Sequence, residues 1–166
     1  NVLAGDVIFY DKKKPEVLYT SPVSGEIIEI RRGDKRSITE IVILADKEQN
    51  YKQFEVPSDI AFREELVKFL LDTGAWMMIN ERPYDVVPDI DSIPQNIFIS
   101  TFDTAPLAPD NNIFVNGNET AFQKGVDVLA KLTEGNVFLG VKGDDNQSLA
   151  FTQAKNCVVK YINGVH

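Results

Sequence analysis

The chain has 166 residues, 43% of them apolar and 25% charged, which is the composition of an ordinary globular protein of one or two domains. Acidic residues outnumber basic ones by 25 to 17, so the net charge of −8 argues against a protein that binds the phosphate backbone of nucleic acid. A single cysteine and a single histidine exclude, by count, a disulfide framework, a Cys/His zinc site and a cysteine-ligated iron–sulfur cluster within the chain.

The sequence has no segment typical of a membrane protein or a secreted one. No apolar run approaches the roughly 20 residues that a membrane-spanning helix needs, so we expect no direct membrane span. No secretory leader precedes the first strand, and the lone Cys157 suits a reducing compartment. Because the chain starts at Asn1 and not at Met, we expect it to be a piece of a longer protein, and the small number of strands predicted towards its end indicates that the C-terminal end is missing as well.

Residues 1–56 predict a small β domain. Short β-branched and aromatic runs, separated by Gly, Pro and Asp turns, predict strands at 7–10, 17–19, 26–30 and 40–44. The pairs Gly5-Asp6 and Gly33-Asp34 each lie beside a strand, which suggests a duplicated barrel-sandwich of the biotinyl and lipoyl type. The segment from Ser21 to Ile27 resembles the crossing segment of that family. In such a turn the Pro fixes the φ angle, and the Gly permits an unusual combination of φ and ψ.

The lysines of this domain are the residues that a carrier function would need. Carrier domains present the modified lysine on a tight hairpin between short apolar residues. Here Lys12, Lys13 and Lys14 lie in a charged loop, between Asp11 and Pro15. We therefore interpret the loop as a solvated surface and expect no prosthetic group on it.

Residues 57–94 predict a helical connector. Ser58 or Asp59 is suited to cap the helix, and Gly74 is placed to end it. The spacing predicts that one face of the helix carries Phe62, Leu66, Phe69 and Leu70. An apolar segment at 75–79 and a stretch rich in Pro and Asp follow, up to Pro94.

Residues 95–166 predict a truncated Rossmann-like α/β unit. The pattern gives a buried strand at 96–101, a helix at 119–132 that ends at Gly135, a strand at 137–141, a short helix at 148–155 and a strand at 157–162. Alternating strands and helices imply a parallel sheet, here of about three strands. The expected fold class is therefore α+β or α/β, with a small barrel-sandwich β domain first.

The loop from Phe102 to Asp110 argues against a dinucleotide site. Such a site needs a Gly-rich turn after its first strand, whereas this loop has two prolines and no glycine. We expect neither NAD(H) nor FMN to bind with useful affinity. Asp103 and Thr104 follow the carboxyl end of the strand, where α/β proteins bind ligands, but the interpretation that we favour is that they shape the loop.

One aromatic cluster could line a pocket for a flat apolar ligand. It consists of Trp76, Met77, Met78, Arg82 and Tyr84. Arg82 or Tyr84 would meet a carbonyl oxygen of the ligand. The alternative, which the usual role of aromatic clusters at a junction favours, is an interdomain core.

The sequence predicts no catalytic residue and no metal site. Asp85, Asp89 and Asp91 alternate in one loop, and Asp144-Asp145 follows Gly143, but neither set has the spacing of a calcium loop. We expect both to be solvated. His166 is the final residue, and with one histidine no Ser/His/Asp or Cys/His set can be built.

Several motifs, in order along the chain, resemble the A component of the bacterial sodium-translocating NADH:quinone reductase. They are Asp11 to Pro15, Ser21 to Gly25, Ile30 to Arg36, Gly74 to Trp76, Arg82 to Tyr84, Val87 to Pro94, Asp103 to Ala108 and Leu132 to Gly135. Each motif alone has little specificity, but their order and spacing resemble that family from one end of the chain to the other.

The resemblance implies a peripheral, cofactor-free subunit on the cytoplasmic face of the bacterial inner membrane, with the other subunits of the reductase as its partners. Ubiquinone or menaquinone would be a substrate of the whole complex, and this fragment would be a scaffold without catalytic activity of its own. If it contributes to quinone binding, Phe102 and Asp103 would join the aromatic cluster as one edge of the pocket. The alternative is a biotinyl-like carrier or interaction module fused to a degenerate nucleotide-binding fold.

Overall fold

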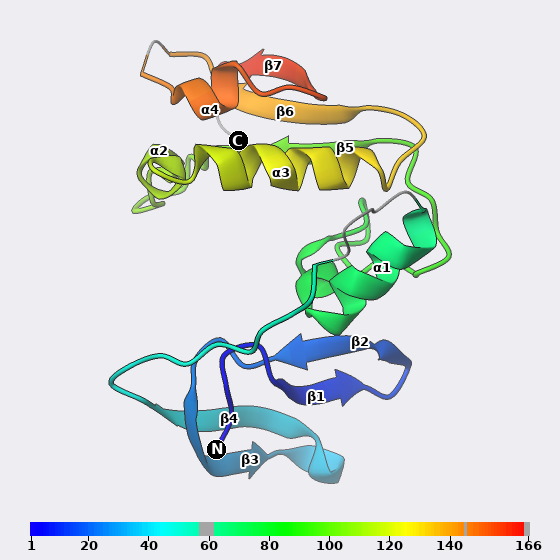
Figure 1. The fold of residues 1–166 in the computed structure, drawn as a ribbon, viewed down its shortest axis with the longest axis vertical. Helices are drawn as coiled ribbons and strands as arrows, with labels where there is room; N and C mark the ends of the chain where they lie inside the picture. The colour runs from blue at the N-terminus through cyan, green and yellow to red at the C-terminus, as the bar shows by residue number, and fades with distance from the viewer. Residues whose placement is uncertain (57–61, 145, 165–166) are drawn as a thin grey trace. The chain divides into compact units, whose positions relative to one another are not determined.

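The computed structural model describes residues 1–56, 62–144 and 146–164, and these fall into two compact units, Asn1–Ile90 and Asp91–His166 (Figure 1). Each unit is described by itself. Among the described residues, the first contains four strands, one α-helix and two short 3₁₀ helices, and the second contains a parallel sheet with three helices. The division into 1–56, 57–94 and 95–166 stays a prediction, and the compact units group the helix of the connector with the β strands.

The four strands predicted for the first unit are confirmed. Strands β1 (Val7–Asp11) and β2 (Lys14–Thr20) form one antiparallel pair, and β3 (Gly25–Arg32) and β4 (Ile38–Ala45) form another. The 3₁₀ helix η1 (Asp34–Arg36) closes the β3–β4 hairpin. Each pair contains register shifts, which is typical of short strands that bend sharply.

The segment between β2 and β3 is built around Ser24, which is fully buried. The amide of Ser24 donates to Oε1 of Gln49 at 2.8 Å, and its hydroxyl oxygen accepts from the amide of Asn50 at 2.9 Å. The next residue must be small, because a Cβ atom on Gly25 would overlap the carbonyl oxygen of Leu44. Packing and hydrogen bonding therefore explain why Ser24 and Gly25 occupy these positions of the motif.

Helix α1 (Arg63–Asp72) and the 3₁₀ helix η2 (Ala75–Met78) complete the first unit. Gly74 separates them with a φ of +75°, as predicted for a residue that ends a helix. The predicted caps Ser58 and Asp59 lie outside the described residues. The prediction for Phe62 is wrong, because this residue precedes the helix and its side chain is 66% exposed, whereas Leu66 is fully buried.

The second unit confirms the predicted parallel sheet. Strands β5 (Ile97–Ser100), β6 (Val137–Lys142) and β7 (Val158–Ile162) lie in the order β5-β6-β7, and both pairs are parallel. Helices α2 (Asn111–Val115) and α3 (Glu119–Ala130) connect β5 to β6, and α4 (Leu149–Thr152) connects β6 to β7. The structure thus contains two successive β-α-β connections.

Four details of the second unit differ from the prediction. Helix α3 ends at Ala130 and not at 132, because Lys131 already forms its C-cap, and α2 was not predicted at all. The short helix α4 covers four residues and not the whole of 148–155. The first strand is not buried on both faces, since the side chain of Phe98 is 75% exposed.

Gly135 does not end helix α3 but permits a close approach of two backbone segments. A Cβ atom at this position would overlap the carbonyl oxygen of Gln95 and would lie 2.8 Å from Oδ1 of Asn96. The amide of Asn136 donates to that same Oδ1 atom at 3.0 Å. The glycine therefore allows the chain that enters β6 to lie against the chain that enters β5.

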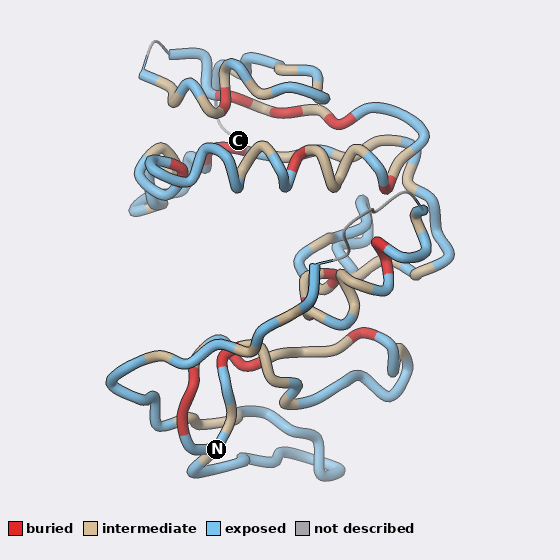
Figure 2. Tube along the Cα trace, in the orientation of Figure 1, coloured by how far each residue is buried: buried red, intermediate tan, exposed pale blue. Residues whose placement is uncertain are grey.

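The core of the second unit lies on one face of the sheet. Leu139 and Val141 of β6 are fully buried and pack against Val115 of α2 and Phe151 of α4. Figure 2 shows where the buried residues lie along the chain. Partly buried residues of β5, α3 and β7 surround them, namely Ile99, Phe122 and Val159. All three helices therefore cover the same face.

Candidate functional site

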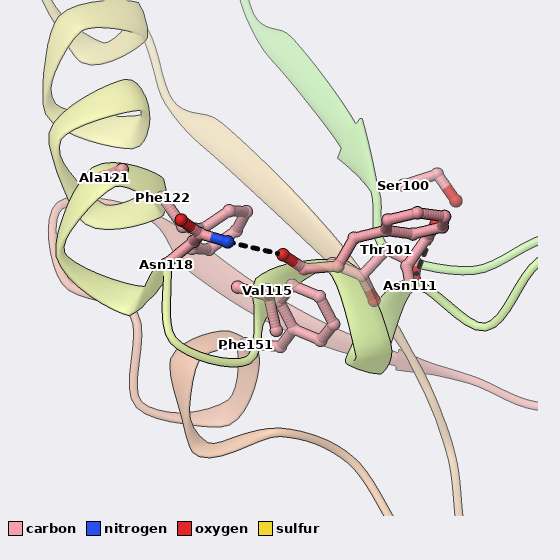
Figure 3. A pocket seen from close by; sticks show the side chains of 9 residues that line it. Ser100, Thr101, Asn111, Val115, Asn118, Ala121, Phe122 and Phe151 are labelled. Atoms are coloured by element: carbon pink, nitrogen blue, oxygen red, sulfur yellow. Dashed lines mark hydrogen bonds between the residues drawn. The ribbon is translucent and has the colours of Figure 1, made fainter. Parts of the chain in front are cut away.

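A cavity of about 400 Å³ opens at the carboxyl end of β5 (Figure 3). Its aromatic walls come from three helices, with Phe114 on α2, Phe122 on α3 and Phe151 on α4. The rings of Phe122 and Phe151 meet edge to face, with centroids 5.1 Å apart. The carboxyl ends of parallel strands are where α/β proteins bind ligands, so we treat this pocket as the candidate site of the second unit.

The polar groups of this pocket are held by hydrogen bonds to the backbone. Nδ2 of Asn111 donates to the carbonyl oxygen of Thr101 at 3.1 Å, and the hydroxyl of Thr101 donates to the carbonyl oxygen of Gly140 at 3.0 Å. At the far side, Nδ2 of Asn118 donates to the carbonyl oxygen of Phe114 at 3.1 Å (Figure 3). These bonds fix the orientation of both amide side chains.

Two acidic residues, Asp110 and Glu119, lie next to lining residues of the pocket but outside its walls. Asp110 caps α2, because its Oδ1 atom accepts from the amide of Asn112 at 3.0 Å. The pKa of Glu119 is lowered because its carboxylate accepts a hydrogen bond from the amide of Gly117. The walls themselves are aromatic, aliphatic, hydroxyl and amide groups, which suit binding of a flat uncharged ring and offer no group for proton transfer.

In the first unit, the predicted aromatic cluster starts on η2. Trp76 is buried, and its Nε1 atom donates to the carbonyl oxygen of Pro88 at 3.2 Å. Met77 is partly buried, whereas Met78 is 80% exposed. Trp76 therefore fastens the segment after α1, and Met78 is the apolar side chain of η2 that reaches solvent.

Arg82 and Tyr84 lie on a short loop that backbone hydrogen bonds close. The amide of Glu81 donates to the carbonyl oxygen of Val86 at 2.8 Å. The amide of Asp85 donates to the carbonyl oxygen of Glu81, also at 2.8 Å. Tyr84 is 74% exposed, and Arg82 forms an exposed ion pair with Asp85, with a separation of 3.7 Å. The loop thus presents one phenol and one guanidinium to solvent.

Phe102 and Asp103 belong to the second unit. Phe102 is buried next to the carboxyl end of β5, and Asp103 is exposed, with its Oδ1 atom accepting from the amide of Ala105 at 2.7 Å. This bond closes the turn that the sequence predicted for Asp103. The set of seven residues named for a quinone pocket is therefore divided between the two units, with five residues in the first and two in the second.

The remaining candidates from the sequence are a group of lysines, the cysteine, the histidine and an aspartate. Lys12 and Lys13 lie exposed between β1 and β2, whereas Nζ of Lys14 donates to the carbonyl oxygen of Val87. Burial raises the pKa of the partly buried Cys157 thiol, with a smaller contribution from the charge of Asp127. His166 and Asp145 lie outside the described residues.

Residues 1–56, 62–144 and 146–164 contain neither a cluster of metal ligands nor a helix suited to cross a membrane. No group of three or more His, Cys, Asp or Glu side chains among these residues is placed to hold a metal ion. Over the same ranges, no helix combines the length and the apolar character needed to cross a bilayer.

The sequence interpretation missed the pocket residues Asn111, Phe114 and Asn118. Asn111, Asn112, Asn116 and Asn118 cluster shortly after the strand at 97–100, and such a group of amides near the end of a parallel strand was a usable signal. It was overlooked because α2, which carries three of the lining residues, is too short to have a helical pattern of its own.

The fold defines an α+β protein in which two antiparallel strand pairs precede a parallel α/β unit. A family model described as the NqrA N-terminal barrel-sandwich hybrid domain matches residues 1–46, and a model described as the NqrA second alpha/beta domain matches residues 61–166. The second match covers more than half of the chain. The chain therefore belongs to the NqrA family.

Curated relatives agree with this assignment. The A components of the Na(+)-translocating NADH-quinone reductases from Saccharophagus degradans and Vibrio atlanticus are each 41% identical to the chain over 168 residues. The corresponding protein from Actinobacillus pleuropneumoniae is 35% identical over 170 residues. Each alignment covers 99% of this chain, and the chain spans only 37% to 38% of the length of these relatives.

Proposed function

We propose that this chain is part of the A component of a sodium-translocating NADH:quinone reductase and acts there as a scaffold. The observation that carries the proposal is the similarity to relatives of that name along 99% of the chain. In the intact complex, NADH oxidation would drive quinone reduction and sodium export, with the other subunits as partners. The chain itself would not catalyse a reaction, in keeping with a pocket whose walls carry no titratable side chain.

The same proposal gives the chain a peripheral position on the cytoplasmic face of the bacterial inner membrane. The lone cysteine is a free thiol, which suits a reducing compartment and is in keeping with this side of the membrane. The α/β unit would be a Rossmann-like fold that holds no nucleotide or other cofactor. Support for that part comes from Asp110, since its carboxylate takes the helix N-terminus that a phosphate group would occupy.

The experiment that tests the proposal uses the intact gene in its native host. Deletion should abolish the sodium-stimulated NADH:quinone reductase activity of isolated membranes, and the full-length gene should restore that activity. A tagged full-length protein should also copurify with further subunits after mild detergent extraction. Normal sodium-stimulated activity in the deletion strain would refute the proposal.

We further propose that the exposed residues of the first unit contribute to quinone binding. A quinone needs a flat apolar surface and one or two donors for its carbonyl oxygens. Met78 would supply the surface and Arg82 and Tyr84 the donors, supported by their exposure on η2 and the adjacent loop. Trp76 and Met77 would hold that surface in place. A role for Phe102 and Asp103 of the second unit stays a prediction from the sequence.

The quinone proposal is tested in the whole reductase with variants of the two donors. Loss of a neutral hydrogen bond in Tyr84→Phe should raise the Kd for quinone about two- to tenfold, and loss of the charged donor in Arg82→Ala should raise it more. Tyr51→Phe and Arg31→Ala serve as matched controls, because Tyr51 is 65% exposed and Arg31 is also an exposed, ion-paired arginine. Unchanged affinity in both variants, with photo-crosslinks of a quinone analogue outside residues 1–166, would remove this part of the proposal.

A second candidate is a biotinyl-like carrier or interaction module. The observation in its favour is the exposed position of Lys12 and Lys13 at the turn between β1 and β2, where carrier domains present their modified lysine. The charged neighbours of these lysines argue against it. Intact-mass measurement of the protein from its native host decides the matter, since a biotin or lipoyl adduct on either lysine would favour the carrier.

A further inference from the structure

The turn of the β3–β4 hairpin is a basic surface on an acidic chain. Four cationic residues occur within six positions of this turn and all four are exposed, namely Arg31, Arg32, Lys35 and Arg36. The chain as a whole has a net charge of −8. Figure 1 shows η1, which contains two of these residues, at the end of the β3–β4 pair. Neither the α/β pocket nor the proposed quinone contacts make use of these charges.

One of the four cations is paired within the hairpin. Nε of Arg31 lies 3.1 Å from a carboxylate oxygen of Glu29, and Nη1 of the same guanidinium donates to Glu40 on the facing strand. Among the residues that the structure describes, no carboxylate lies within 4.0 Å of the side-chain nitrogens of the other three. We call these three the basic tip, namely Arg32, Lys35 and Arg36.

Backbone geometry and hydrogen bonds hold the basic tip in one compact turn. Lys35 and Arg36 have φ angles of +53° and +61°, in the left-handed region that residues other than glycine rarely adopt. Nη1 of Arg32 donates to the carbonyl oxygen of Arg36 at 3.1 Å. The amide and the hydroxyl of Ser37 both donate to the carbonyl oxygen of Asp34, at 3.1 and 2.9 Å. These bonds stabilise a strained backbone that keeps three cationic side chains together.

Exposed cations of this kind suit a surface that carries many phosphate groups. A guanidinium can donate two parallel hydrogen bonds to one phosphate. Because all three residues are exposed, a single free phosphate would compete there with water and salt, and such an isolated pair contributes little. An anionic bilayer instead presents a dense layer of phosphates with a negative surface potential, and each Lys or Arg near it strengthens binding about fivefold.

The acidic character of the rest of the chain is compatible with such a contact. Charges are screened over about 8 Å at physiological ionic strength, so a bilayer at the turn interacts mainly with the charges of the turn. Strands β3 and β4 have eight residues each, and Lys47 follows the end of β4 opposite the turn. At about 3.3 Å per residue, Lys47 lies roughly 25 Å along the hairpin from the basic tip.

We propose that the basic tip docks on the phosphate headgroups of an anionic phospholipid bilayer and holds the first unit against the membrane surface. The inference rests on the proposed peripheral position at the membrane, and it adds the surface that makes the contact. That position favours lipid phosphates over an acidic polypeptide as the partner. Asp34 is the one acidic residue from 31 to 36, so its charge opposes the contact.

Sedimentation with lipid vesicles tests the proposal on the full-length polypeptide. The protein should bind vesicles of phosphatidylglycerol and phosphatidylcholine, should not bind vesicles of phosphatidylcholine alone, and should dissociate as the salt concentration rises. Lys35→Gln combined with Arg36→Gln should weaken binding about 25-fold. This double variant keeps Arg32 and the carbonyl oxygen of residue 36, and therefore the hydrogen bond that closes the turn.

Two further variants show whether the position of the charge matters. Lys47→Gln combined with Lys124→Gln removes the same charge from exposed residues outside the basic tip, and its binding should match that of the wild type. Asp34→Asn should strengthen binding about fivefold, a gain that loss of folding would not produce. Circular dichroism verifies that all variants are folded.

Four outcomes would overturn the proposal. They are equal binding to both kinds of vesicle, equal weakening in the two double variants, displacement by inorganic phosphate at the concentration of lipid phosphate, and displacement by polyglutamate at a lower concentration of charge. The last would make an acidic polypeptide the partner. Absence of vesicle binding, with reductase activity still dependent on the gene, would remove this inference alone. Vesicle binding without that dependence would instead refute the proposed function.

Discussion

At the scale of single residues, the glycines show how the same residue type serves different purposes. Gly74 adopts a left-handed conformation that ends α1, whereas Gly135 permits contact between two backbone segments. Gly125, in the middle of α3, has no atom within 4 Å of the position where a Cβ would lie. The first two are therefore required by the fold, and the third is not.

A matched pair of glycine variants tests this distinction. Gly135→Ala should lower the free energy of unfolding by about 1–3 kcal/mol, because the new Cβ overlaps the Gln95 carbonyl oxygen and the backbone must shift. Gly125→Ala should raise it by about 0.5–1 kcal/mol, because alanine is the better helix former and the site is open. Urea unfolding monitored by circular dichroism measures both. Equal stability of the two variants would contradict the structure.

A second residue-scale prediction separates Trp76 from Tyr84. Trp76→Phe should destabilise the protein by about 1–3 kcal/mol, because the Pro88 carbonyl oxygen loses its donor in a buried place. Tyr84→Phe should change the stability by less than about 0.5 kcal/mol, since the phenol is mostly exposed. Thermal unfolding of both variants gives the comparison. A neutral Trp76→Phe would show that this hydrogen bond is not needed to hold η2.

At the scale of elements, a polar contact joins helix α3 to the segment before β7. The side-chain amide of Gln123 donates to the carbonyl oxygen of Lys155 at 3.0 Å and accepts from the amide of Lys155 at 2.9 Å. Asp127, one turn further along α3, accepts from Nδ2 of Asn156 and from Nε2 of Gln123, both at 2.8 Å. These bonds hold the edge strand β7 next to the helix layer.

The carboxylate of this contact predicts a dependence of stability on pH. The hydrogen bond from Asn156, followed by that from Gln123, lowers the pKa of Asp127 in the folded state. A lowered pKa adds stability above the ordinary aspartate value of about 3.9, and this stability is lost as the pH falls through the folded pKa. Asp127→Asn should therefore be less stable than the wild type at neutral pH, and the difference should shrink below about pH 4.

Urea unfolding across a series of pH values measures this effect. The comparison variant is Lys124→Ala, a neighbouring exposed change on α3 that leaves the contact with Lys155 and Asn156 in place. Its unfolding free energy should follow that of the wild type at every pH. A difference between Asp127→Asn and the wild type that stays constant down to acid pH would exclude the carboxylate as its source.

At the scale of the whole molecule, the α/β unit combines a parallel sheet with a loop after β5 that does not suit a phosphate. The segment after β5 contains two prolines, and Leu107 has a φ of +64°. Asp110 then places a carboxylate at the N-terminus of α2. Negative charge at this point repels phosphate, and the net charge of −8 adds to the repulsion.

We therefore expect calorimetric titration of the chain with NADH or FMN to detect no binding at micromolar concentrations. Asp110→Asn keeps a side chain that can cap α2 and removes its charge, so it tests the electrostatic part of the explanation. The variant should still fail to bind, because the loop lacks the glycines that let a backbone approach a pyrophosphate. Micromolar affinity of the wild-type chain for either nucleotide would refute this expectation.

Local patterns were sufficient where the signal lies within a few neighbouring residues. The four strands of the first unit, the end of α1 at Gly74 and the β-α-β order of the second unit all follow from β-branched runs, a helix-ending glycine and apolar spacing. The candidate site was less accessible to this reasoning. Its pocket is lined from β5, α2, α3 and α4, and sequence spacing does not reveal which side chains from four elements meet.

By itself, the sequence determined the family and the kinds of elements in this protein, because ordered motifs and hydrophobic periods are properties of the chain alone. Only the tertiary structure decided what each position does. Gly135 permits a backbone contact because Gln95, 40 residues earlier, lies against it, and Phe98 is exposed because both connections run over the opposite face. Burial depends on neighbours that are distant in sequence. For this reason β5, which the sequence predicted to be a buried strand, has a residue, Phe98, that is largely exposed.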